Sequence, residues 1–433
     1  MKWFDGLVNV VANLGTARDK AAHTYYAADC LPQNELLNIY RSSWLGKSIV
    51  DYPAEDATRK WRKWRANTDQ ITRIEALETS LQLAKRVQQA MISARLFGGA
   101  AIYINVNTKT QDKPLQIGAP IASLIVLPQS VLTPEQIVQD INNPYYGKPE
   151  FYLLQSEGKS VRIHASRLVI FVGAEMPHGA AEMLGVQGWG DSVLQSTLDA
   201  IKQVDATMAN MASLVFEAKV DVFKFESFAE MLADSANDEM LARRLNLQAA
   251  MKGINGAVVI DAKDDYDQKS ASFASLPEVV AKFMEAVSGA ARIPATRLYG
   301  RSAAGLSGTG DGDERVYYDR IGYMQASDMT PALAALDECL IYQALGERPP
   351  EIYYQWAPLR QLTETERADV FAKTATAARS LAGAQAGELI PMDALSEALV
   401  NELTEQGMLP GLDQAIAKFG SLSGQSLPQE DLL

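Results

Sequence analysis

The sequence has few of the residues on which disulfide bonding and membrane insertion depend. Only two cysteines, Cys30 and Cys339, occur in 433 residues. Their wide separation argues against a disulfide framework and fits a reducing compartment. No apolar run reaches about 18 residues, so we expect no transmembrane helix and no membrane partner. Asp5 and Asn9 interrupt the apolar residues at the amino terminus, which argues against a secretory signal.

Positive charge is also scarce. The chain has 40 lysine and arginine residues against 53 aspartate and glutamate residues, giving a formal net charge of −13. Compact proteins that grip nucleic acid by its phosphates usually carry a basic excess, so any contact with DNA is expected to be local or weak. With 47% hydrophobic residues, the chain can bury the core of two or three domains, or of one elaborated domain.

Recognisable catalytic motifs are missing. There is no G-x-S-x-G elbow, no HExxH and no CxxC pair. His164 and Ser166 form a His-x-Ser sequence that resembles half of a two-histidine phosphoesterase site. That chemistry needs a second motif to supply another general acid or base, and His178 has no hydroxyl two residues later. We therefore favour a structural histidine in a strand turn, and we predict no catalytic residue, no cofactor and no bound metal.

What the sequence does have is a glycine-rich stretch between two helical patterns. Residues 300–312 hold five glycines. Glycine adopts conformations closed to other residues, so the stretch is either a mobile or specially shaped loop, or a ligand cradle. Gly305 and Gly310 have P-loop spacing, but Asp311 and Gly312 stand where lysine and a hydroxyl residue are required. An aspartate there would repel phosphate, which favours the loop.

Two charged clusters admit both a binding and a structural interpretation. Residues 59–65 interleave five basic residues with Trp61 and Trp64. They form either a nucleic-acid patch or a strand whose long cations shield the tryptophan rings, and we favour the strand. The aspartates within residues 261–267 suit either a divalent cation or a solvated turn, and we expect the turn.

Hydrophobic periodicity predicts a mixed α+β chain. Helices are expected over residues 70–97, 191–217, 227–250, 277–294, 314–340, 363–382 and 391–406. Strands are expected over residues 100–106, 121–127, 150–154, 167–172, 220–225, 256–261 and 351–356. Ser192 and Gln195 match a capping box at the start of one long helix. Pro331 falls inside another, which predicts a kink.

The order of these elements and several local sequences match those of one known family. Segments 124–128 and 163–171 are similar to its wing region. Segment 188–194 is similar to the start of its first stem helix, and 293–300 to the turn after its second. Segment 317–321 is similar to the helix behind its tunnel loop. Over most of its length, the chain resembles the portal proteins of tailed bacteriophages and related prophages.

The resemblance implies a portal fold with an α+β wing, a long helical stem, a small α/β clip, a kinked helix and a short helical crown. It divides the chain into a wing (1–190), stem helix 1 (191–217), clip (218–272), stem helix 2 (273–296), tunnel loop (297–313), kinked helix with a returning wing strand (314–362), and carboxy-terminal helices or crown with a flexible tail (363–433).

The resemblance implies a structural protein and not an enzyme. Portal proteins form a homo-oligomeric ring, usually a 12-mer, at one capsid vertex of the virion, after assembly in the host bacterial cytoplasm. Double-stranded DNA passes through the ring during packaging and ejection. The implied partners are the terminase motor, the head-tail adaptor and the major capsid protein. Two alternatives remain: a phosphate-ester-processing enzyme around His164, or another virion adaptor.

Some relatives of this prophage group carry an extra phosphoesterase domain. The absence of a second histidine motif predicts that this chain has none. The expected channel residues are Arg297, Arg301, Ser302, Leu306, Ser307, Gly308, Thr309, Gly310 and Asp311. A ring of cations would hold DNA by counterion release, whereas small polar residues let it slide. Arg297 and Arg301 are expected to contact DNA or to pair with an acidic residue, such as Asp311, of a neighbouring subunit.

Overall fold

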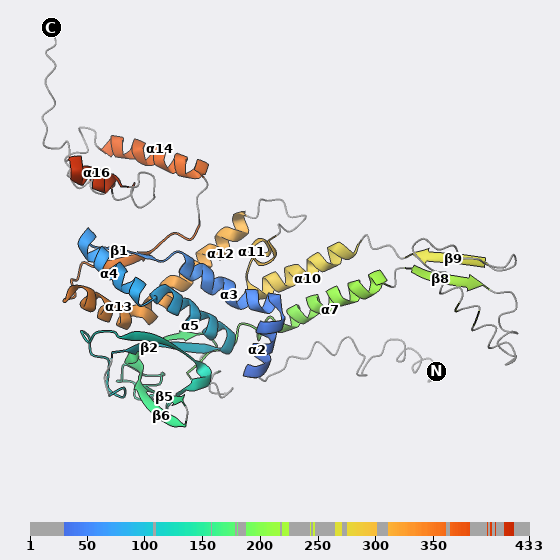
Figure 1. Ribbon diagram of the computed structural model, residues 1–433, viewed down its shortest axis with the longest axis horizontal. Coiled ribbons are helices and arrows are strands. Elements are labelled where there is room, and N and C mark those ends of the chain that lie inside the picture. Colours follow the sequence, from blue (N-terminus) through green and yellow to red (C-terminus); the bar gives the residue numbers. More distant parts are fainter. Residues whose placement is uncertain are drawn as a thin grey trace, which may run out of the picture. The chain divides into compact units, whose positions relative to one another are not determined.

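The computed structural model describes most of the chain between residues 30 and 419 (Figure 1). The described residues are 30–106, 110–156, 158–177, 188–216, 219–224, 265–270, 275–300, 311–360, 364–381 and 411–419, with a few single positions between them. The chain divides into two compact units, residues 1–359 and 360–433. Each unit is described by itself.

Helices α2 (Gln33–Ser42), α3 (Trp44–Arg59), α4 (Thr68–Ser80) and α5 (Leu83–Phe97) begin the first unit. The single helix expected over 70–97 was wrong, because Gln82 takes a left-handed backbone conformation with φ 52°. That conformation separates α4 from α5. Apolar spacing continues on both sides of the break, so periodicity gives no sign of it. The expected end of the helix at Gly98 is confirmed by its φ of 96°.

The central sheet has the order β3-β2-β7 and is antiparallel. Strand β2 (Gly99–Asn105) lies between β3 (Ser123–Pro128) and β7 (Leu168–Val172), which confirms three expected strands. Strand β2 alternates between two cores, as strand geometry requires. Ile102 and Ile104 join the large cluster shared with the helices, whereas Ala101 joins a smaller cluster on the opposite face.

A second antiparallel sheet covers that opposite face. It has the order β4-β5-β6, formed by β4 (Leu132–Pro134), β5 (Phe151–Ser156) and β6 (Lys159–His164). Figure 1 shows α5 and this small sheet on either side of β2. Strand β5 was expected. Strands β4 and β6 were not, because β4 has only three residues and β6 is mostly polar, with half of its residues exposed.

Trp189 packs directly on the backbone of β2. Its side chain is buried, and a Cβ atom added at Gly99 would overlap its indole ring. We therefore expect Gly99→Ala to lower the free energy of unfolding by about 1–3 kcal/mol, the usual cost of overpacking. Gly289→Ala is the matched control, because nothing lies within 4 Å of its added Cβ and alanine favours helices by about 0.5–1 kcal/mol. Denaturant unfolding of both variants measures this, and equal stabilities would contradict it.

Two helices and a hairpin form the next part of the chain. Figure 1 shows α7 (Leu198–Phe216) and α10 (Leu276–Ala291) side by side. The start expected at residue 191 was wrong, since residues 193–197 form turns. The capping box also does not form. The Ser192 hydroxyl accepts the N–H of Leu194, and the side-chain Oε1 of Gln195 accepts the N–H of Leu31.

The hairpin between these helices pairs β8 (Lys219–Lys224) with β9 (Asp265–Ser270). Strand β8 was expected. The strand expected over 256–261 and the helix expected over 227–250 lie outside the described residues, apart from single helical positions. Asp265 and Asp267 lie in β9, so the expected turn was wrong for those two aspartates. Among the described residues, no three metal-binding side chains gather.

A long helical segment follows residues 301–310. It comprises α12 (Asp311–Met324), the π-helical turn η5 (Gln325–Met329) and α13 (Thr330–Leu345). Strand β10 (Tyr353–Trp356) then returns to pair with β1 (Arg62–Arg65), as expected for residues 351–356. Pro331 lies in the first turn of α13, where a missing N–H costs little. The departure from α-helical bonding lies just before it, and the kink stays a prediction.

The second unit contains α14 (Glu364–Leu381), which confirms the helix expected over 363–382, and α16 (Leu412–Phe419), which was not expected. The helix expected over 391–406 falls largely outside the described residues. Within the described part of the chain, no helix combines the length and hydrophobicity needed to span a bilayer.

Candidate functional site at the base of residues 301–310

Most of the expected channel residues cannot be placed, because residues 301–310 lie outside the described part of the chain. These are Arg301, Ser302, Leu306, Ser307, Gly308, Thr309 and Gly310. The two ends of the segment are described. Helix α11 (Ala295–Tyr299) precedes it and α12 follows it from Asp311. Both ends of the loop expected over 297–313 are therefore helical.

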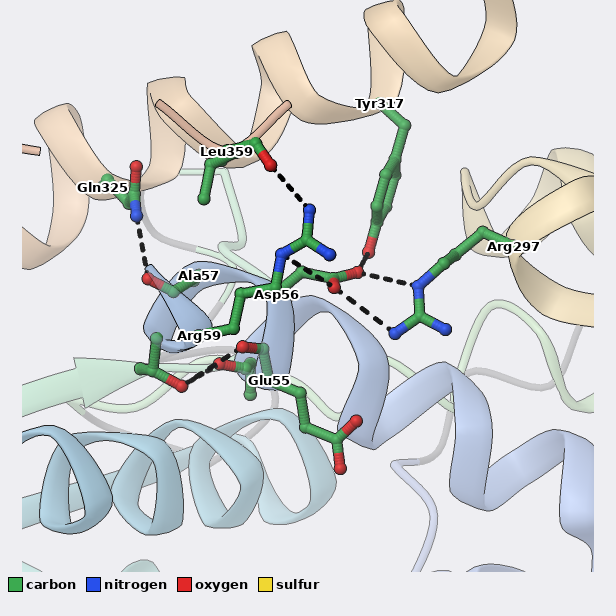
Figure 2. A network of polar contacts seen from close by, with 10 residues as sticks. Glu55, Asp56, Ala57, Arg59, Arg297, Tyr317, Gln325 and Leu359 are labelled. Carbon is green, nitrogen blue, oxygen red and sulfur yellow. Dashed lines mark hydrogen bonds and ion pairs between the residues drawn. The ribbon is translucent and has the colours of Figure 1, made fainter. Parts of the chain in front are cut away.

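One buried carboxylate contacts both ends. Asp56, near the end of α3, is only 1% exposed. Figure 2 shows it between Arg297 of α11 and Tyr317 of α12. Its Oδ2 accepts a hydrogen bond from Arg297 Nε at 3.0 Å and from the Tyr317 hydroxyl at 2.8 Å, and its Oδ1 accepts Arg297 Nη2 at 3.3 Å. Two-pronged arginine–carboxylate pairs fix orientation as well as distance.

Arg59 extends this network by one turn of α3. Its Nε lies 3.7 Å from Asp56 Oδ1, and its Nη2 donates to the Leu359 carbonyl at 2.7 Å. Its guanidinium also lies over the ring of Tyr318, 4.8 Å from the centroid, a favourable cation–π arrangement. The end of α3 therefore contacts α11, α12 and the last residue of the first unit.

The end of α3 is also joined to the π-helical turn. Gln325 is 1% exposed, and its amide donates to the Ala57 carbonyl at 2.8 Å. That carbonyl is in the last turn of α3, where helical carbonyls lack intrahelical partners. The Thr330 hydroxyl donates to the Gln325 carbonyl at 2.9 Å and accepts the Trp356 indole N–H at 3.0 Å. Hydrogen bonds therefore hold the end of α3 on the α12–η5–α13 segment.

Helix α3 reaches Asp56 only by passing Pro53. Proline has no N–H, so the Ile49 carbonyl loses its helical partner. Arg95 of α5 replaces it, since its Nη2 donates to Ile49 O at 2.7 Å and its Nε donates to Val50 O at 2.9 Å. Burial lowers the pKa of Arg95 to about 10, so it remains charged at neutral pH. The helix therefore continues through the proline and presents Asp56.

The network shifts the pKa values of the two groups that donate hydrogen bonds to Asp56. Burial raises the pKa of Tyr317, and the negative charge of Asp56 raises it further. Burial opposes the charge of Arg297, but the hydrogen bond and charge of Asp56 outweigh it and raise that pKa. Tyr317 therefore stays neutral and Arg297 stays charged at all ordinary pH values, which keeps both hydrogen bonds in place.

Sequence reasoning placed Arg297 but missed its partner. In this structure Arg297 forms an ion pair with Asp56 of the same chain, and the expected contact with DNA or with an acidic residue of a neighbour stays a prediction. The guanidinium also lies 4.0 Å from the centroid of the Tyr52 ring. Asp56 is separated from Arg297 by 241 positions. No local pattern distinguishes it from the other acidic residues of the chain, so no sequence signal could have identified it.

His164 lies elsewhere, at the end of β6, and is 5% exposed. Its Nδ1 accepts the N–H of Ser166 at 3.2 Å and lies 2.8 Å from the Ser166 hydroxyl, so it caps a short 3-10 turn. Tyr145 and Phe151 contact the imidazole edge-on. Burial lowers its pKa, with Glu150 opposing this effect and Arg167 adding to it. The expected position in a strand turn is confirmed, and a purely structural role for His164 stays a prediction.

The basic run at residues 59–65 also proves structural. The favoured strand is confirmed as β1, and Arg62 within it is fully buried. Its guanidinium donates two hydrogen bonds to Asp337, at 2.6 and 2.7 Å, and one to Glu78 at 2.8 Å. It lies 4.7 Å from the centroid of the Trp64 ring. One guanidinium therefore forms ion pairs with two buried carboxylates.

These features define an α+β protein with two paired helices around an inserted hairpin, and with a segment whose two ends are tied to one carboxylate. The chain belongs to the phage portal protein family, because the family model described as "Phage portal protein" matches residues 34–380. This match confirms the resemblance inferred from the sequence.

Similar curated proteins cover nearly the whole chain. It is 40% identical over 438 aligned positions to "Anti-CBASS protein Acb1" of Caulobacter sp. (strain RHG1), covering 97% of this chain and 70% of that relative. It is 35% identical to a protein of the same name from Sphingomonas paeninsulae, covering 96% of this chain and 68% of the relative. An uncharacterized protein of Haemophilus influenzae is 28% identical, covering 95% and 92%.

Solved structures share the fold at low identity. A chain from the virion of a native gene transfer agent particle is 14% identical, with a TM-score of 0.51, covering 82% of this chain and 93% of that one. A chain from the neck of the native particle, computed with C12 symmetry, is 15% identical, with a TM-score of 0.52, covering 82% and 92%. At these identities the likeness establishes the fold.

Proposed function

We propose that this chain forms a ring, a 12-mer, at one vertex of a phage capsid, and that double-stranded DNA passes through the ring during packaging and ejection. The observation that carries the proposal is the family match over residues 34–380. The twelvefold symmetry used for the similar neck structure supports the subunit number. Assembly would take place in the host cytoplasm, with the ring retained in the virion.

Within this ring we assign residues 297–313 to the channel wall. The contacts at the base of the segment support this assignment. Arg297 forms a two-pronged ion pair with Asp56 of the same chain, so its charge is not left unpaired for passing phosphates. Each additional phosphate contact would add salt-dependent affinity. Pairing of Arg297 within the chain therefore favours sliding of DNA, which a conduit requires.

We assign the remaining parts by the same resemblance. Residues 1–190 would form the wing, 191–217 and 273–296 the stem, and 363–433 the crown. The insert at 218–272 would be the clip, which meets the terminase motor and later the head-tail adaptor. The capsid protein would surround the ring at the vertex. The pairing of α7 with α10 around the β8–β9 hairpin supports a stem that carries a clip.

A genetic experiment tests the proposal. If the gene is removed from the phage or prophage that encodes it, we expect heads that contain no DNA, and expression of the chain in trans should restore filled heads. Quantitative PCR of nuclease-treated particles measures the packaged DNA. Normal DNA content in particles that lack the chain would contradict the proposal.

A second candidate is a phosphate-ester-processing enzyme, and 97% of this chain aligns with a relative named as an anti-CBASS protein. His164 would be its catalytic candidate. Its burial and its hydrogen bonding to Ser166 disfavour that role. A phosphodiesterase assay of the purified chain discriminates between the two functions. Activity that disappears in His164→Ala would favour the enzyme, whereas a conduit has no such activity to lose.

A further inference from the structure

We propose that Asp56 is the positioning residue that holds α11 and the first turns of α12, which flank residues 301–310, in place on α3, and that DNA passage depends on this placement. The effect on DNA rests on the proposed conduit function. The placement of the two helices concerns the chain alone and is tested separately.

The geometry assigns this role to a single atom. Asp56 Oδ2 accepts hydrogen bonds from Arg297, which precedes the segment, and from Tyr317, which follows it. Because both donors converge on one oxygen atom, neither end can shift without lengthening a hydrogen bond to it. Asp56 is 1% exposed, so water cannot readily replace either donor.

No other polar contact performs this task in the described part of the chain. Helices α11 and α12 both pack on α3, and we find no hydrogen bond or ion pair that joins α11 to α12 directly. The Tyr299 hydroxyl instead donates to the Met284 carbonyl of α10, at 3.0 Å. The polar connection between the two ends therefore runs through α3, and Asp56 is the residue that makes it.

The same helix offers a matched control. Asp51 is 8% exposed and also accepts a tyrosine hydroxyl, with Tyr40 Oη at 2.9 and 3.2 Å from its two oxygens. Tyr40 belongs to α2, which has no hydrogen bond to either end of the segment. Asp51→Asn therefore perturbs a comparable buried carboxylate–tyrosine contact on α3 and leaves the ends of the segment bonded to Asp56.

The test compares full-length Asp56→Asn, Tyr317→Phe and Asp51→Asn by hydrogen–deuterium exchange and by DNA content of complemented particles. Local opening governs amide exchange. We expect Asp56→Asn to speed exchange in α11 and the first turns of α12 by about tenfold or more. Tyr317→Phe should speed exchange in α12 alone. Asp51→Asn should leave exchange in both α11 and α12 unchanged. Particles carrying Asp56→Asn should hold less DNA than those carrying Asp51→Asn.

The outcomes separate this inference from the proposed function. Equal exchange in α12 for Asp56→Asn and Asp51→Asn would overturn the positioning role. If Asp56→Asn does not fold, Tyr317→Phe decides, because it removes one hydroxyl and leaves the ion pair; unchanged α12 exchange in that variant would overturn the inference. Faster exchange together with normal DNA content would support the positioning role and count against the conduit assignment of residues 297–313.

Discussion

Deletion of Ser302–Gly310 is expected to leave ring assembly intact and to abolish DNA packaging or retention. Glycine-rich stretches contribute little side-chain burial, so their loss should not unfold the chain. The helices on either side keep their own anchors, because Arg297 and Tyr317 both bond to Asp56 outside the deleted residues. The conduit would lose the part of its wall that meets DNA.

Two measurements on the same variant check this prediction. Electron microscopy should show rings like those of the wild type, and nuclease-treated particles should contain no more DNA than particles that lack the chain. A glycine–serine replacement of the same length separates loss of the side chains from loss of the segment. Loss of folding or of rings in the deletion, or normal DNA content, would contradict the channel assignment.

Arg62→Ala should cause the largest loss of stability in the first unit. The substitution leaves Glu78 and Asp337 buried without their shared cation. Breaking a buried ion pair by removing one partner costs about 3–5 kcal/mol. Lys282→Ala removes an exposed ion pair with Glu285 and should cost less than about 1 kcal/mol. Denaturant midpoints of both variants measure the difference, and equal midpoints would contradict the account.

The loss in Arg62→Ala should depend on pH. Burial raises the pKa of Glu78 and of Asp337, although Arg62 opposes the rise. A carboxyl whose folded pKa is raised stabilises the fold below its ordinary pKa of about 4, and this contribution is lost as pH rises through the folded pKa. Without Arg62 the pKa values should rise further. The free-energy gap between variant and wild type should therefore widen from pH 4 to pH 7, and a constant gap would contradict this.

Elements with strong local signals could be predicted from the sequence. Strand β2 is a mainly apolar run that directly follows the glycine at the end of α5. Helix α10 begins at Leu276, with Pro277 in its first turn and a regular apolar stripe after it. The position of His164 in a strand turn was also predicted correctly, because it directly follows an alternating strand pattern. In each case the information lies within a few residues, where propensity and spacing operate.

Features without a local sequence signal could not be predicted. The left-handed Gln82 interrupts a stripe that is periodic on both sides. Gln195 bonds to Leu31 in place of the expected capping box, which delays the start of α7. The Asp56 contacts join residues more than 200 positions apart. Such pairings depend on how α3, α11 and α12 pack together, which residue spacing does not encode.

Electron microscopy of the purified full-length chain tests the central claim most directly. The portal account predicts closed rings, with twelvefold rotational symmetry and a central channel wide enough for a DNA duplex. A chain that stays monomeric at high concentration, or that forms assemblies without a channel, would contradict it.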